Sequence, residues 1–254
     1  MTGNLGIDRI VVILDPAGEH RTAIHSAVEL ASALNLPLHG IFAEDEALHD
    51  LAGHSIASHM GLGNLLPQVM ERDFLDAALK VEARRSRLLL DAAARQSGVA
   101  ATFALWRGYP SLLSMGAGEH DLVVVEGFSR PLTGQAQLPS PWPRRVASDG
   151  VSVLVLKRGL ARHLVIGSVT DDDAANRSLR IANPLAKRLA GSVVVLRPGQ
   201  VVAHATTQER SGMMRGYAEI ECDMVVLDEN LTDSATSSAL IAEGHCSVLL
   251  LRRR

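Results

Sequence analysis

The chain is poor in cysteine and in aromatic residues, and its charge has no large excess of one sign. Its two cysteines, Cys222 and Cys246, cannot form a disulfide framework and show no metal-ligand spacing, which fits a reducing compartment. Aromatic residues are 3% of the sequence and leave few rings on which nucleic-acid bases could stack. The 25 Lys and Arg against 28 Asp and Glu give a formal charge of -3, which provides no field to hold a phosphate backbone. We therefore expect no nucleic-acid partner.

Long hydrophobic runs are also absent. The longest are of the kind found at residues 10–14 (Ile-Val-Val-Ile-Leu), far shorter than the roughly 18 to 20 residues that a membrane helix needs. Residues 1–9 carry no basic stretch leading into an apolar segment, so no secretory signal is predicted. We expect a cytoplasmic protein without membrane insertion. With 254 residues, 47% of them hydrophobic, the chain can form one large or two small packed domains.

The first half of the chain alternates expected strands with expected helices. Residues 10–14 are apolar throughout and end at Asp15, which is typical of a strand buried on both faces of a parallel sheet. A long polar connection, residues 44–67, precedes the longest helix, and the helical spacing predicts a buried stripe formed by Met70, Phe74, Ala77, Val81, Leu88 and Ala92. The expected strands are 10–14, 38–42, 102–106, 121–125 and 151–156, and the expected helices are 24–34 and 69–97.

The second half repeats this pattern in a shorter form. Residues 158–162 are the expected joint. Beyond it the expected strands are 164–166, 192–196, 201–205, 224–227 and 246–251, and the expected helices cover 175–189 and 233–243. Strands that alternate with helices predict an open parallel sheet with helices on both faces. The sequence thus predicts a tandem repeat of one α/β domain, with domain 1 at 1–157 and a shortened domain 2 at 158–254.

The order of elements and several local strings resemble the universal stress protein family in its tandem two-domain form. Residues 108–110 (Gly-Tyr-Pro) stand where that family has a Gly-x-Pro turn, and residues 121–125 (Asp-Leu-Val-Val-Val) stand where it has an Asp-Leu-Ile-Val-Met-Gly-like strand. The resemblance covers most of the first half. It implies two doubly wound open parallel sheets of the adenine nucleotide alpha-hydrolase-like kind. It also implies that the fifth strands, 151–156 and 247–251, pair edge to edge, so that the chain forms its own pseudo-dimer.

The phosphate-binding motif of that family is largely missing. Its nucleotide-binding members carry G-x2-G-x9-G-[ST], and a gapless count from Asp121 places the motif positions on Glu126, Ser129, Pro139 and Ser140. Only Ser140 matches. A phosphate loop needs glycines whose amides converge on the anion, whereas Pro139 has no N–H and the Glu126 carboxylate would repel a triphosphate. The second half has residues 228–230 (Asp-Glu-Asn) in place of such a loop.

Further residues complete the candidate site. Shifting the register by one places the first glycine of the motif on Gly127 and a later motif position on Arg130. Arg130 could pair with a phosphate, although the phosphate loop is still incomplete in this register. In the family's ATP binders an acidic residue at the end of strand one contacts the adenosine, and Asp15 fits that position; it could also cap the following helix. Its counterpart in the second half is expected near residues 167–168 (Gly-Ser). The ligand-binding candidates are Asp15, Ala43, Glu126, Gly127, Ser129, Arg130 and Ser140.

Other chemistries are disfavoured by spacing. His49, His54 and His59 are five residues apart, so a helix would turn them by about 140° per step onto different faces, and a metal site would need an acid from residues 44–46. The sequence contains no G-x-S-x-G elbow, no GxGxxG and no GxxxxGK[ST]. We therefore expect no catalytic residue and no metal.

The function expected from the resemblance and the altered loop is that of a universal stress protein-like binding or sensory protein in the stress response, without catalysis and without a cofactor. Its partner would be a small molecule or a protein, both of unknown identity. The alternative is a weak ATP or AMP binder that acts as a nucleotide-dependent switch or weak ATPase. Association of whole chains into a homodimer stays open at this point.

Overall fold

The computed structural model describes the strands and helices of both halves of the chain. It describes residues 6–16, 20–46, 49–50, 58–59, 68–69, 72–108, 115–129, 138–139, 151–169, 177–196, 222–231, 237, 240–241 and 246–252. The first half contains β1 (Arg9–Leu14), α1 (Arg21–Leu34), β2 (Leu38–Asp45), β3 (Ser58–His59), β4 (Gln68–Val69), α3 (Arg72–Ser97), β5 (Ala101–Gly108), β6 (Asp121–Glu126), β7 (Phe128–Ser129), β8 (Leu138–Pro139) and β9 (Ser152–Leu156). The second contains β10 (Val165–Val169), α5 (Arg177–Leu189), β11 (Ser192–Leu196), β12 (Met224–Asp228) and β13 (Ser247–Leu251).

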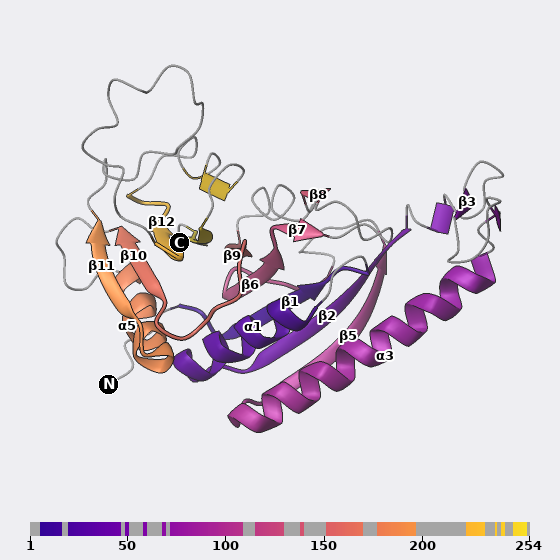
Figure 1. Ribbon diagram of the computed structural model, residues 1–254, viewed down its shortest axis with the longest axis horizontal. Coiled ribbons are helices and arrows are strands. Elements are labelled where there is room, and N and C mark those ends of the chain that lie inside the picture. The colour runs from indigo at the N-terminus through magenta and orange to yellow at the C-terminus, as the bar shows by residue number, and fades with distance from the viewer. Residues whose placement is uncertain are drawn as a thin grey trace, which may run out of the picture.

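Nine of these strands form one continuous sheet (Figure 1), in the order β11-β10-β12-β13-β9-β6-β1-β2-β5. Neighbouring strands are parallel except β13 and β9, which pair antiparallel with Leu249 opposite Leu154. The predicted α/β fold and the predicted pairing of the two fifth strands are confirmed. The prediction of two separate parallel sheets is corrected, because this pairing merges both halves into one mixed sheet and satisfies two strand edges that would otherwise be exposed.

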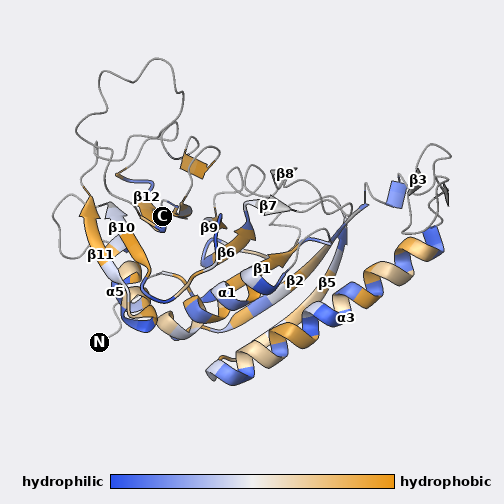
Figure 2. Ribbon diagram, in the orientation of Figure 1, coloured by the Kyte–Doolittle hydropathy of each residue, from blue (hydrophilic) through white to orange (hydrophobic). Residues whose placement is uncertain are grey.

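The central strands are buried along nearly their whole length. All positions of β9, β12 and β13 are buried, and β1 and β6 each have one half-buried end. In Figure 2, where the ribbon is coloured by hydropathy, β1 and β6 are hydrophobic along much of their length. Alternate residues feed two clusters, one on each face of the sheet. Continuous apolar runs therefore specify strands that are covered on both sides, as expected for the interior of an α/β sheet.

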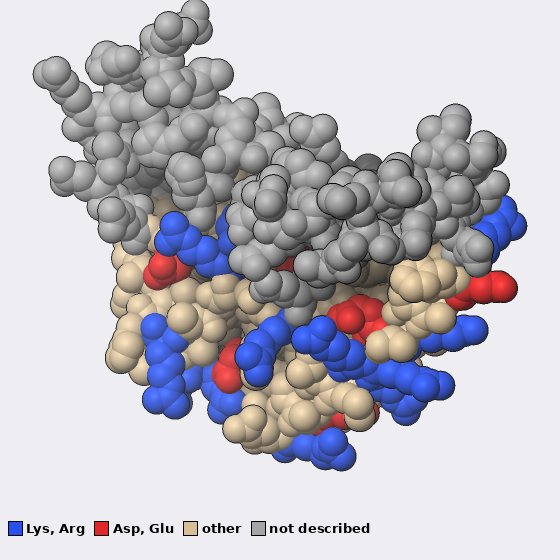
Figure 3. Space-filling view, turned by 45° about the vertical axis from the view of Figure 1, so that its right-hand side comes forward, with Lys and Arg blue, Asp and Glu red and all other residues tan. Residues whose placement is uncertain are grey.

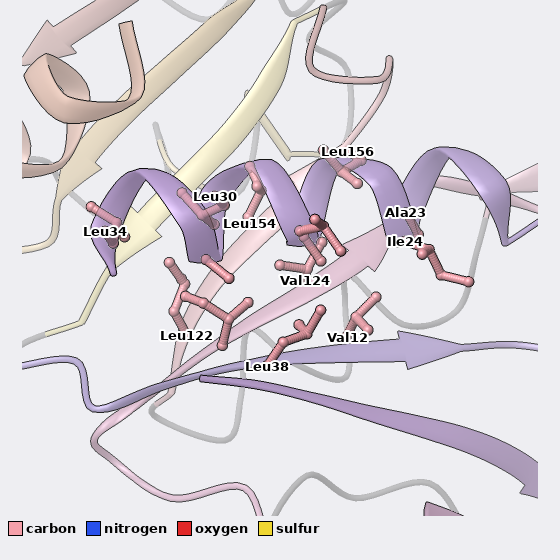
Figure 4. Packing of buried hydrophobic residues seen from close by; sticks show 14 of the residues in the cluster. Val12, Ala23, Ile24, Leu30, Leu34, Leu38, Leu122, Val124, Leu154 and Leu156 are labelled. Atoms are coloured by element: carbon pink, nitrogen blue, oxygen red, sulfur yellow. The ribbon is translucent and has the colours of Figure 1, made fainter. Parts of the chain in front are cut away.

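Helices α1, α3 and α5 cover one face of the sheet (Figure 1). The close view in Figure 4 shows Ile24 and Leu30 of α1 in the same hydrophobic cluster as Leu122 and Leu154 of the sheet. Each fully buried side chain of this kind contributes about 1.5–3 kcal/mol to folding. Among the described residues of the other face, Met115 and Ala117 and the helical residues at 240–241 pack on the sheet. The expected strand at 201–205 and most of the expected helix at 233–243 lie outside the described residues.

The joint between the halves is held by contacts to α1 and β13. The Leu160 amide donates to Ser26 Oγ of α1 at 3.0 Å, and the Lys157 amide donates to Ser247 Oγ at 3.1 Å. Glu29 of α1 forms a 2.9 Å ion pair with Arg188 of α5. Residues from both halves thus contribute to one packed body. Of the helices in the described residues, none is both long enough and apolar enough to cross a bilayer.

The expected buried stripe of the longest helix is wrong. Helix α3 buries Leu79, Ala83, Ser86, Leu90, Ala93 and Ala94, whereas Phe74, Val81 and Leu88 are exposed. The reason is a close approach to the sheet, because a Cβ added to Gly40 of β2 would lie only 2.6 Å from Leu90 Cδ2. Small residues such as Ala83 and Ser86 permit this approach beside Leu90, whereas Phe74, Val81 and Leu88 face outward.

A charge placed in the seam between β9 and β13 tests this architecture. Val153 is fully buried and lies opposite Leu250. We expect Val153→Asp to lower the free energy of unfolding by about 3 kcal/mol or more, because it buries an unpaired carboxylate. Thermal melting and binding of a hydrophobic dye measure the loss. The control is Ser192→Asp on exposed β11, which should melt like the parent; a Val153→Asp variant with parental melting and dye binding would place the seam elsewhere.

Candidate functional site

The sheet order reverses direction between β1 and β6. From β1 the chain continues to β2 and β5 on one side, and then returns to β6 and β9 on the other. Open α/β sheets bind ligands outside the carboxyl ends of their strands at such a reversal. We call the carboxyl ends of β1 and β6 the first switch point. The carboxyl ends of β10 and β12, where the second half reverses in the same way, are the second switch point.

Four of the predicted site residues meet at the first switch point. The pair Leu14 and Phe42 is the last in the ladder of β1 and β2, so the next residues, Asp15 and Ala43, lie at one level. The ladder of β1 and β6 continued at the same register places Gly127, the residue after Glu126, beside Asp15. Asp15 and Glu126 are half-buried, whereas Ala43 and Gly127 are buried. The structure therefore places four of the candidate residues at the carboxyl ends of β1, β2 and β6.

The remaining predicted residues belong to the segment after β6. Ser129 is the second residue of β7, which pairs antiparallel with β8 so that Ser129 lies opposite Leu138 and Phe128 lies opposite Pro139. Arg130 and Ser140 lie outside the described residues. The two ends of the expected phosphate loop are thus joined in a short two-stranded ladder.

Gly127 serves the packing of the sheet. Its amide donates a 2.7 Å hydrogen bond to the Leu156 carbonyl at the end of β9. A Cβ at this position would lie 2.9 Å from Lys157 Cδ and 3.0 Å from the Leu156 carbonyl oxygen, so only glycine allows this approach. Burial lowers the pKa of the neighbouring Lys157 amine. An amide that already binds a carbonyl is not available to a phosphate oxygen.

A buried histidine, which sequence reasoning missed, fixes the loop after β1. His20 precedes α1 with a left-handed φ of 54°, and α1 has no side-chain cap, so the alternative of a capping role for Asp15 is wrong. His20 Nδ1 lies 2.5 Å from Ser86 Oγ of α3, and its Nε2 bonds to the Asp15 carbonyl. Its ring meets the Phe42 ring edge-on at a centroid distance of 5.8 Å. The buried position of His20 is set by tertiary packing, and no local sequence motif indicates it.

The protonation state of His20 follows from these partners. A carbonyl only accepts hydrogen bonds, so Nε2 carries a proton and donates to Asp15. Burial lowers the pKa of His20 and favours the neutral ring, although the carbonyl of Asp15 and the charge of Glu82 act in the opposite direction. The single hydroxyl proton of Ser86 then has two acceptors, Nδ1 of the neutral ring at 2.5 Å and the Glu82 carbonyl at 2.9 Å. The pair therefore holds the β1–α1 connection against α3.

A cluster of charged residues lies at the carboxyl ends of β2 and β5. Arg107 stands opposite Glu44 in the ladder, and its Nε donates to Glu44 Oε2 at 2.8 Å while its Nη2 donates to Asp76 Oδ1 at 3.3 Å. His49 Nδ1 is 3.3 Å from Asp76 Oδ1, and its buried Nε2 is 3.7 Å from Glu44 Oε2. The facing ends of two parallel strands could have revealed the pair of Glu44 and Arg107.

This cluster replaces the metal site that the histidines suggested. Arg107 occupies the carboxylates that would have been the ligands, and no group of three or more His, Cys, Asp and Glu within the described ranges could hold a metal ion. His54 lies outside those ranges, and of His59 only the backbone of β3 is described. Within the described residues, the structure thus brings His49 close to Glu44.

The second switch point is occupied by ion pairs of the chain itself. Asp228 at the end of β12 is buried, and its Oδ1 accepts hydrogen bonds from the Asn230 amide at 3.0 Å and from Asn230 Nδ2 at 2.9 Å. Its Oδ2 lies 3.9 Å from Nη1 of Arg177, which also donates to the Arg252 carbonyl at 2.9 Å. The Arg252 guanidinium pairs with Glu229. The two acids of residues 228–230, Asp228 and Glu229, are thereby both bound to donors of the same chain.

The registers correct the expected counterpart of Asp15. Ile10 lies opposite Leu122 in the first half, and Ile166 lies opposite Met224 in the second, where residues 223–228 (Asp-Met-Val-Val-Leu-Asp) match residues 121–126 (Asp-Leu-Val-Val-Val-Glu). Ile166 therefore corresponds to Ile10, and the counterpart of Asp15 is Asp171. The expected position at 167–168 was wrong because those residues lie inside β10. Asp171 itself is outside the described residues.

The two cysteines are free, half-buried thiols that precede β12 and β13. Burial raises the pKa of Cys222 to about 11 and also raises the pKa of Cys246. Both groups are therefore protonated at neutral pH, and the thiolate that a nucleophile or a metal ligand needs is not formed. The expectation of reduced structural thiols agrees with this environment.

The fold is similar to two solved structures from Pseudomonas aeruginosa. A protein of unknown function from strain PAO1 matches with a TM-score of 0.54 and 15% identity, over 98% of this chain and 94% of that chain. A protein from strain UCBPP-PA14, provisionally named a universal stress protein, matches with a TM-score of 0.53 and 14% identity, over 98% of this chain and 95% of that chain. No family model and no curated protein matches the sequence. At these identities the likeness shows the fold, which is that of universal stress proteins.

The buried His20 gives stability a specific dependence on pH. Its folded pKa lies below the unfolded value of about 6.5, so the unfolded chain binds more protons in between. The free energy of unfolding is then unaffected by this group above about pH 6.5 and falls below it, by at most about 1.4 kcal/mol per pH unit, until the folded pKa is passed. Chemical denaturation at a series of pH values measures this slope.

The His20→Gln variant is the control for that slope. It removes the titrating group and retains His39, whose pKa is also lowered by burial, so the difference between the two pH profiles isolates His20. Parallel profiles below pH 6.5 would contradict the assignment of a neutral buried ring.

Proposed function

We propose that this protein is a universal stress protein-like, cytoplasmic binding protein of the stress response. It has no catalysis of its own, and neither of its switch points holds a nucleoside triphosphate. The observation that carries the proposal is a carboxylate at the same register position in both halves. Glu126 ends β6 and Asp228 ends β12, and both face the place where a phosphate loop would begin. The fold shared with a provisionally named universal stress protein supports the family role.

Electrostatics oppose a phosphate at the first switch point. A carboxylate about 4 Å from a phosphate oxygen costs roughly 4 kcal/mol at an effective dielectric constant of 20. The Gly127 amide is bound to Leu156, and the backbone of Phe128 and Ser129 pairs with β8, so these amides do not converge on an anion. Asp15 and Glu126, both half-buried, favour a small polar ligand without phosphate, or a neutral or cationic group of a protein partner.

At the second switch point, ion pairs within the chain oppose the binding of a phosphate. Arg177 and Arg252, which pair with Asp228 and Glu229, are bound to these acids, and Arg177 also donates to a backbone carbonyl of the chain. A phosphate that entered would have to break these pairs and would leave a buried Asp228 without its cation. We therefore assign ligand binding to the first half only.

The absence of catalysis rests on the placement of the one serine–histidine pair found near a switch point in the described residues. His20 and Ser86 are both buried between α1, α3 and β2, and their hydrogen bonds are used within the chain. A nucleophile and its base must reach the substrate, so this pair positions the β1–α1 connection and performs no chemistry.

A weak ATP- or AMP-dependent switch is the second candidate. It is favoured by Lys157, a cation that packs against Gly127 at the first switch point. In that case the Lys157 ammonium would offset part of the repulsion from Glu126. Nucleotide titration separates the two proposals.

The nucleotide test compares the parent with a variant that restores the loop. With Mg-ATP or AMP we expect no melting shift in the parent, whereas Glu126→Gly combined with Ser129→Gly and Pro139→Gly should gain a shift of several degrees. Ligand at about 100 times its dissociation constant adds about 2.7 kcal/mol to the folded state. Differential scanning fluorimetry measures the shift, and a phosphate-release assay on the parent reports hydrolysis.

Two controls separate charge from loop shape. Glu126→Gln removes the carboxylate charge and keeps its size, and Glu229→Gln makes the same change at the second switch point. A shift in Glu126→Gln alone would show that charge is the main obstacle, while Glu229→Gln should respond like the parent. A parent that melts several degrees higher with Mg-ATP, or that releases phosphate, would favour the switch and refute the proposal.

A further inference from the structure

Helix α3 carries a regular apolar stripe on the face that points away from the sheet. Phe74, Val81 and Leu88 are 59%, 65% and 67% exposed and follow one another at intervals of seven residues. Seven residues make nearly two full helical turns, so these side chains form a straight row about 21 Å long. Such a row is the pattern by which one helix packs along another.

This stripe is additional to the packing of α3 within the chain. The opposite face of the helix, with Leu79, Ala83 and Leu90, already packs on the sheet and α1. Figure 3 shows Lys and Arg side chains, with uncharged side chains between them, on the lower face of the molecule, where α3 runs in Figure 1. On the sheet beside the helix, Leu105 of β5 is also 61% exposed.

The residues between the three apolar side chains differ at the two ends of the stripe. Ala77 and Ala78 lie on the amino side of Val81, and Arg84 and Arg85 lie on its carboxyl side, all four exposed. A second helix in antiparallel orientation would place the short alanines of one copy against the long arginines of the other. A parallel pairing would instead stack arginine on arginine, which is unfavourable for like charges.

We infer that two copies of this chain associate through α3 in an antiparallel pair whose two-fold axis passes Val81. Phe74 then faces the second copy's Leu88, Val81 faces its own equivalent, and Ala77 and Ala78 face the second copy's Arg84 and Arg85. This arrangement matches the requirement that a two-fold interface be complementary to itself. It also sets the two helix dipoles antiparallel, so that the positive end of each helix lies beside the negative end of the other.

Charges at the margin of the stripe support the same orientation. Asp73 lies eight residues before Val81 and Arg87 lies six residues after it, on the same side of the helix, so the antiparallel pair brings Asp73 within two residues, about 3 Å along the helix axis, of Arg87 of the second copy. Arg87 is 66% exposed and only 3.8 Å from Asp91 of its own helix, so it can extend to a second acid. The two-fold symmetry produces two copies of the contact between Asp73 and Arg87.

The sheet topology removes one surface through which two chains could otherwise associate. The edge of β9, which would be open in a single first half, is already paired with β13 of the same chain. Helix α3 lies at the far end of the sheet beside the edge strand β5, well away from that seam (Figure 1). Two chains could therefore join through α3 without disturbing either switch point.

Disulfide cross-linking tests both the contact and its direction. In a background with Cys222→Ser and Cys246→Ser, Val81→Cys should form a cross-linked dimer under mild oxidation, because each copy meets its own equivalent on the axis. Leu88→Cys alone should remain uncross-linked, since the two equivalent positions are about 21 Å apart in the antiparallel pair. Phe74→Cys combined with Leu88→Cys should cross-link again.

Sedimentation or light scattering then measures the association without cysteines. We expect the parent to be dimeric and Val81→Glu to raise the dimer dissociation constant at least about tenfold, while Val195→Glu on β11, where the valine is 50% exposed, leaves it unchanged. Circular dichroism should show that both variants fold like the parent. A monomeric parent, an unchanged Val81→Glu, or cross-linking of Leu88→Cys alone would each overturn the inference.

Discussion

The antiparallel pairing of β9 with β13 determines how the rest of the molecule is arranged. Each strand closes its own half of the sheet, and each would expose a row of unpaired backbone groups if that half stood alone. Matching apolar sequences, Ser-Val-Leu-Val-Leu and Ser-Val-Leu-Leu-Leu, bury each other at this seam. One chain thereby builds from two repeats what would otherwise need two chains, and both switch points keep fixed positions in one sheet.

Because the two halves repeat one pattern, the ends of their equivalent strands can be compared, and these ends differ. At equivalent positions the first half has Glu126 and Gly127, and the second has Asp228 and Glu229. In the first half the acid remains half-buried at the edge of the sheet, beside a glycine that permits close contact with Lys157. In the second half the acids are bound by Arg177 and Arg252. One switch point has therefore become part of the structural framework, while the other has half-buried carboxylates at the ends of β1 and β6.

Much of the sheet could be predicted from the sequence, because strands buried on both faces require continuous apolar runs such as residues 10–14, 121–125 and 247–251. The group formed by Asp15, Ala43 and Gly127 followed from the same strand ends. The buried face of α3 could not be predicted in this way, since its helix has two apolar stripes and the decisive contact, Leu90 over Gly40, joins distant parts of the chain. His20 and the pair of Glu44 and Arg107 were missed for a similar reason: only the assembled sheet brings their partners together.

The outward stripe of α3 connects these observations. A buried surface can use small residues where backbones approach closely, as Ala83 and Ser86 do, so the presence of Phe74, Val81 and Leu88 on the other side is not required by the fold. Large apolar side chains in water reduce solubility and gain nothing unless they are covered. In a chain that has already paired β9 with β13 internally, a helix with two apolar faces provides a further, independent surface. Association between chains and packing within the chain can then vary separately, because they depend on opposite faces of one helix.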